Sequence, residues 1–136
     1  MKKTIAMLLL LILCLNLCAC KKDVKAEIIL NGGDSLQLTS KEVFEDFGKY
    51  HNAGIRITAK VVNIECIPIN TLYSGWVNHY QITLEGGWVI YRLSENAILP
   101  LCIDVDDTIS VEGCMYRREG SQVMILAFTI NGHDVA

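Results

Sequence analysis

The stretch Gly54-Ile55-Arg56-Ile57-Thr58-Ala59-Lys60-Val61-Val62-Asn63-Ile64 decides the fold. Apolar and polar side chains alternate in it up to Val61, which is the pattern of a strand with one buried face. Val62 breaks the alternation, and Ile64 with Cys66 resumes it in a shifted phase. A one-residue shift inside a long strand indicates a β-bulge, which lets the strand curl around a closed sheet.

The chain that follows keeps the alternating pattern and turns at glycines and acidic residues, so we expect a mainly β domain. Pro68, Asn70 and Ser74-Gly75 predict a loop over residues 67–78. The later elements are expected, in order, to be a hairpin of 79–85 and 88–93 around Gly86-Gly87, a short helix or irregular connection at 94–100, an acidic turn at 104–107, and a hairpin of 108–116 and 123–130 around Gly120.

A short helix is expected before the first long strand. Thr39 and Glu42 have the spacing of a capping box, and apolar residues follow at intervals of three and four up to His51. Asn52 and Gly54 would end this helix. Ahead of it, residues 27–30 and 35–38 flank a glycine turn and predict a small N-terminal hairpin.

Counted from Gly54, these strands have the order of an OB-fold, a five-stranded Greek-key barrel that would cover about residues 54–132. The stretch 54–64, the segment Tyr80-Gln81-Ile82-Thr83-Leu84 and the acidic turn before 108–113 are similar to the tRNA-anticodon-like OB domains of bacterial lipoproteins and exported proteins of unknown role. The similarity spans about residues 41–132. It implies the fold and supplies no catalytic residues. A small β-sandwich or another barrel type is the alternative.

The N-terminus has the features of a secretory signal peptide over residues 1–19. Lys2 and Lys3 precede an apolar run of about 11 residues, which is shorter than the ~20 that a membrane-spanning helix needs. Leu17-Cys18-Ala19-Cys20 resembles the lipobox of bacterial lipoproteins, which implies a lipid on Cys20 with palmitate-like acyl chains. The alternative is an ordinary signal peptide that leaves Cys20 as a free thiol. We therefore expect a protein anchored at the extracytoplasmic face of the cell membrane.

The composition of the processed chain favours a single acidic domain. Removal of residues 1–19 leaves 136 − 19 = 117 residues, with residues 20–26 as a lipidated tether and 27–136 as one OB-fold-like domain. The leader holds two of the 12 basic residues and none of the 15 acidic ones, so the formal charge becomes 10 − 15 = −5. Affinity for phosphate backbones depends on clustered cations, so nucleic acid is an unfavoured partner.

Neither a catalytic nor a metal-binding motif is present in the sequence. It lacks the Gly-x-Ser-x-Gly and His-Glu-x-x-His motifs and a phosphate-binding glycine loop, and after Cys20 no histidine or cysteine pair has metal-ligand spacing. We therefore expect no enzyme, no cofactor and no metal. Cys66, Cys102 and Cys114 read as buried thiols, with a Cys66–Cys114 disulfide as the alternative.

Two functions remain open, and both are binding functions. The first is a noncatalytic module that grips a protein, peptide or saccharide with the barrel face and the 67–78 loop. The second is a single-stranded nucleic-acid or oligonucleotide binder, since the region is rich in aromatic residues. The candidate ligand-binding residues are Tyr73 and Trp76 in the loop and Arg92 in the strand 88–93.

Overall fold

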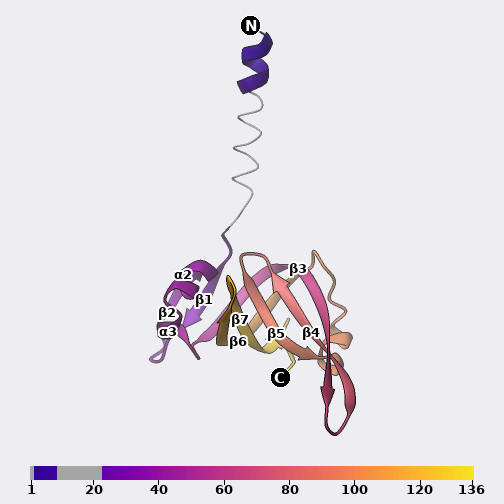
Figure 1. The fold of residues 1–136 in the computed structure, drawn as a ribbon. Coiled ribbons are helices and arrows are strands. Elements are labelled where there is room, and N and C mark those ends of the chain that lie inside the picture. The colour runs from indigo at the N-terminus through magenta and orange to yellow at the C-terminus, as the bar shows by residue number, and fades with distance from the viewer. Residues whose placement is uncertain (1, 9–22) are drawn as a thin grey trace.

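The computed structural model describes residues 2–8 and 23–136, and it confirms a mainly β domain (Figure 1). Its strands form one mixed sheet. Cys20 and most of the apolar leader lie outside the described residues. The elements are β1 (Lys25–Ile29), β2 (Ser35–Thr39), α2 (Ser40–Glu45), α3 (Phe47–Tyr50), β3 (Gly54–Thr71), β4 (Gly75–Leu84), β5 (Trp88–Ser94), α4 (Glu95–Ile98), the 3-10 turn η1 (Leu99–Leu101), β6 (Thr108–Glu119), β7 (Gln122–Ile130) and β8 (His133–Asp134).

Five of these strands close into a ring. Neighbours in the ring follow the order β3-β4-β5-β7-β6, and β6 pairs back onto β3. All pairs are antiparallel except β5 with β7, which is parallel. The expected bulge in β3 is confirmed, because its register to β4 shifts between Val61 and Asn63. The bulge lies where β3 leaves β6, since the pairing with β6 covers only Gly54 to Lys60.

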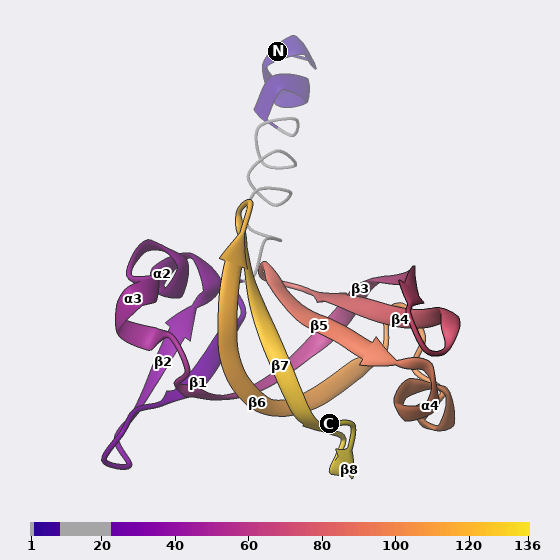
Figure 2. The same cartoon turned by 60° about the horizontal axis from the view of Figure 1, so that its bottom comes forward.

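The predicted N-terminal hairpin is confirmed and extends the sheet beyond the ring. Strand β1 pairs with β2 on one side and with β3 on the other (Figure 2). The capping box of Thr39 and Glu42 is present, and it holds the pKa of the Glu42 carboxyl below its usual value because that carboxylate accepts from the Thr39 backbone and hydroxyl. The expected single helix is broken into α2 and α3 at Asp46, whose φ of −123° is not helical.

The predicted tether, residues 20–26, reaches into the folded domain. Lys25 and Ala26 belong to β1, and Ala26 is fully buried. The carbonyl oxygen of Val24 accepts a hydrogen bond of 3.1 Å from Nε1 of Trp88, which is itself fully buried. The chain is therefore fixed to the ring from Val24 onward.

The predicted loop at 67–78 is wrong. Residues up to Thr71 continue β3, residues from Gly75 begin β4, and the two strands stay paired from Val61 to the turn. We call residues 66–78, which extend beyond the last β5 partner at His79, the arm. Pro68 is accommodated because this part of β3 has β4 as its one neighbour among the described strands, so the other edge needs no donor.

The core lies inside the ring and continues under β1 and α2. Inward side chains of β3 alternate as predicted, with Ile55, Ile57, Ala59 and Val61 all buried. Trp88 is the largest fully buried side chain. The fully buried set with the greatest volume also includes Ile28, Ile82, Leu84, Ile90, Ile109, Met115, Ile125 and Ile130.

Candidate functional site

The tip of the arm carries the most exposed large apolar side chains of residues 23–136. Leu72 and Tyr73 are each 99% exposed and Trp76 is 72% exposed. The turn that presents them is ordered by Thr71, whose hydroxyl accepts from the Ser74 amide and donates to the Gly75 carbonyl. Large apolar side chains are normally buried, so the tip is a candidate contact surface.

Arg92 lies apart from the other two predicted residues, on β5. The pairing register of β4 with β5 shifts between Tyr80 and Ile82, which marks a bulge. Arg92 is one of the extra residues of β5 at this bulge, and its φ is +33°. Its guanidinium carbon lies 5.0 Å from the centre of the Tyr91 ring. Trp76 is three residues beyond His79, where the pairing of β4 with β5 ends, so the structure does not bring Arg92 and the arm tip into one site.

An aromatic and cationic cluster surrounds Arg92 on the outer face. The rings of Tyr91 and Tyr116 lie 5.0 Å apart, although β7 separates their strands. Arg117 covers both rings, at 4.8 Å and 5.5 Å, and pairs with Glu119 at 3.0 Å. Sequence reasoning missed this cluster because the parallel pairing that brings β5 and β7 together joins segments more than thirty residues apart.

A groove of about 310 Å³ opens beside this cluster, where β5 and β7 separate. The two strands pair at Trp88–Ile90 and Val123–Ile125, and their ribbons diverge beyond that point (Figure 2). The groove is lined by both strands, by His79 of β4 and by the residues after β8. Nδ1 of His79 is buried and has no hydrogen-bond partner among the described residues.

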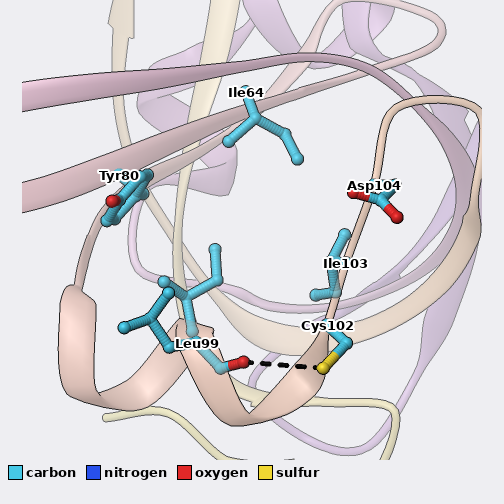
Figure 3. A pocket seen from close by; sticks show the side chains of 7 residues that line it. Ile64, Tyr80, Leu99, Cys102, Ile103 and Asp104 are labelled. Atoms are coloured by element: carbon cyan, nitrogen blue, oxygen red, sulfur yellow. Dashed lines mark hydrogen bonds between the residues drawn. The ribbon is translucent and has the colours of Figure 1, made fainter.

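A second cavity of about 270 Å³ lies between β3 and β4 on one side and the segment of α4, η1 and the residues that follow on the other (Figure 3). Ile64 and Tyr80 form one wall, and Leu99, Cys102 and Ile103 form the other. Partial burial raises the pKa of the Tyr80 hydroxyl, and Cys66 and Glu95 beside it add to the rise. The wall of this cavity is largely apolar, so it offers packing space rather than a set of reactive groups.

The last candidates to place are the three cysteines that follow Cys20. Cys66, Cys102 and Cys114 are free thiols, so the alternative of a Cys66–Cys114 disulfide is wrong. Cys66 pairs with Tyr80 of β4, whereas Cys114 pairs with Gly54 of β3 and Leu126 of β7. Burial raises the pKa of the Cys114 thiol. Cys66 and Cys102 are exposed, contrary to the expectation of buried thiols.

Residues 2–8 and 23–136 contain no group of three or more histidine, cysteine or acidic side chains placed to hold a metal ion. Within the same residues, no helix combines the length and the apolar character that crossing a membrane requires. Comparison of the chain with protein-family models, with curated proteins and with solved structures finds no match.

Proposed function

We propose that this chain is an exported lipoprotein, held by a lipid on Cys20 at the extracytoplasmic face of the cell membrane. In this proposal its folded part is a noncatalytic OB-fold that captures a protein partner with the arm. The ring order supports the OB-fold, because the fourth strand of the ring in sequence, β6, lies between the first and the fifth. The helix α4 in the connection from β5 to β6 is consistent with that topology.

The observation that carries the proposal is the exposed tip of Leu72, Tyr73 and Trp76. Tryptophan and tyrosine dominate the energy of protein interfaces because they bury a large area at a small cost in side-chain entropy. The arm from 66 to 78 contains no charged residue, so it lacks the cations on which affinity for phosphate backbones mainly depends. An apolar pocket on another protein is the surface that matches such a tip.

The position of the arm relative to the proposed anchor also favours a protein partner. Val24 contacts Gly86 and Trp88, at the end of β4 opposite the arm tip. Strand β4 has ten residues, and a strand rises about 3.3 Å per residue, which places the tip about 30 Å from Val24. The four residues from Cys20 to Val24 span at most about 14 Å. In Figure 1 the arm tip points away from the place where the described domain begins. An anchor at Cys20 would therefore present the tip to the space outside the membrane.

Replacing Trp76 and Tyr73 together with serine tests this proposal. We expect capture of the partner in intact cells to fall by at least about tenfold, since residues of this kind contribute about 2 kcal/mol or more each when buried in an interface. The melting temperature should stay unchanged, because both side chains are solvent-exposed. The measurement is the yield of protein cross-linked to a benzoylphenylalanine placed at position 72, quantified on gels and identified by mass spectrometry.

Leu36 provides the matched control, because it is an exposed apolar residue on β2, away from the arm. Leu36→Ser should leave the cross-linked yield unchanged. An equal yield from the double variant and the unaltered protein would contradict the proposal. A fall in melting temperature with the double variant would assign these side chains to the stability of the arm instead.

The alternative function, binding of single-stranded nucleic acid, is favoured by the cluster of Tyr91, Tyr116, Arg92 and Arg117, because bases stack on aromatic rings beside cations. It predicts that a labelled oligothymidylate binds at low salt, that the affinity falls steeply as salt rises, and that Arg92→Glu abolishes it. Filter retention measures this directly. Arg118 is unsuitable for the test, because it donates to the Phe44 carbonyl and stacks on the Phe44 ring. Absence of retention at low salt would eliminate the alternative.

A further inference from the structure

The groove between β5 and β7 contains an open strand edge. On one side β5 stays paired with β4 through Leu93 and Ser94, whereas its pairing with β7 ends at Ile90. On the facing side β8 covers β7, since it pairs with Thr129 and Ile130. Among the strands of residues 23–136, the segment from Tyr91 to Ser94 therefore has no partner on the side of the groove. Such an edge accepts an extended peptide, which supplies the missing hydrogen bonds.

Arg92 offers the groove a cation that can receive an acidic occupant. None of the ten lining side chains is acidic and Arg92 is the one with a permanent positive charge, while the carboxyl-terminal Ala136 lines the same groove without an ion pair to Arg92. No carboxylate of the described residues lies within ion-pair distance of Arg92, whereas Arg56 has two at that distance and Lys60 and Arg117 have one each. A guanidinium that rests on an aromatic ring and lacks an anion is a suitable donor to a ligand carboxylate.

Two further observations point to a ligand rather than to a structural role for these residues. Arg92 holds a positive φ that glycine would adopt more easily, so arginine at this place is not what the fold alone favours. Nδ1 of His79 is buried without a partner at the same groove, and buried polar atoms normally have one. The apolar part of the lining, which includes Leu126 and Phe128, would receive alternate side chains of an added strand.

We propose that the groove between β5 and β7 binds an extended acidic peptide segment, which adds to the edge at Tyr91–Ser94 and places a carboxylate against Arg92. The peptide main chain supplies affinity through strand pairing, and the carboxylate with its apolar neighbours supplies specificity. This groove is separate from the arm tip, so its occupation does not depend on the capture of a protein by Trp76.

The test uses the full chain in detergent and two fluorescein-labelled peptides, Thr-Val-Asp-Val-Asp-Val-Thr and the same peptide with asparagine in place of aspartate. We expect the aspartate peptide to bind at least about tenfold more tightly by fluorescence anisotropy, because a charge-assisted pair to arginine is lost in the other. Arg92→Gln should remove that difference. Arg56→Gln, an exposed arginine on the other side of the ring, should preserve it.

Hydrogen exchange shows where the peptide lies. The aspartate peptide should slow exchange of β5 amides between Tyr91 and Ser94 and leave those of β2, the outer edge strand, unchanged. Arg92→Gly, which relieves the positive φ, should fold with a melting temperature no lower than that of the unaltered protein and still lose the preference for aspartate. Equal affinity for both peptides, protection at β2 instead of β5, or displacement of the peptide by oligothymidylate would each overturn the proposal.

Discussion

Gly113→Ala is expected to unfold the domain or to cost more than about 4 kcal/mol, which is an exceptional effect for one methyl group. A Cβ on Gly113 would overlap the backbone carbonyl of Leu126 on the neighbouring strand, with the Cα of Ala127 close behind. Both the Leu126 carbonyl and the Ala127 Cα are backbone atoms, so no side-chain rotation can relieve the clash. It lies at a bulge where the register of β6 and β7 shifts, and β6 is the strand that closes the ring on β3. Separation of β6 from β7 would open the ring.

Gly48→Ala is the matched control. A Cβ at Gly48 meets no atom within 4 Å, and the residue lies in the helix α3 with no positive φ. Alanine there should leave stability unchanged or raise it by up to about 1 kcal/mol, since alanine favours helix over glycine. Urea unfolding followed by circular dichroism measures both variants. A Gly113→Ala protein that unfolds within about 1 kcal/mol of the unaltered chain would show that the two strands can move apart without loss of the fold.

The local part of this fold could be predicted from the sequence. Alternation identified the strand faces, the shift at Val62 identified the bulge of β3, and the spacing of Thr39 and Glu42 identified the capping box. These features depend on neighbouring residues, so a one-dimensional pattern contains them. Gly113 could not be explained in this way, because the reason for glycine there is the carbonyl of Leu126 on another strand, which no local pattern shows.

The arm and the groove could not be predicted in the same way. Pro68, Asn70 and Ser74-Gly75 are typical of a loop, and a strand tolerates them here because much of the arm has a single neighbour. The groove exists because β5 and β7 pair for three residues and then separate, which is a property of strands distant in the sequence. Tyr73 and Trp76 are exposed, but they belong to a paired arm rather than to the predicted loop, and their role in binding stays a prediction.

Cys20→Ser is expected to abolish lipid attachment completely, because serine offers no thiol for the thioether that a lipobox cysteine receives. In cells fed labelled palmitate, the variant should take up no label. It should be found either as a released domain or as a longer precursor that still carries residues 1–19. Two or three acyl chains give stable membrane anchoring, whereas a single chain binds reversibly, so the loss should change the location of the whole population. Gel fluorography and fractionation of the cells measure both results.

Cys18→Ser is the matched control, since Cys18 follows the bulky Leu17 and lies within the lipobox-like segment 17–20 rather than at its end. This variant should keep the label and remain in the membrane fraction. A Cys20→Ser chain that takes up palmitate, or that has lost residues 1–19 and still stays with the membrane, would contradict the proposed anchor. The second result would indicate that the arm holds the domain at the membrane, because Leu72, Tyr73 and Trp76 are the most exposed large apolar side chains of residues 23–136. Combining Cys20→Ser with the double serine variant of the arm therefore separates attachment through the lipid from attachment through a bound partner.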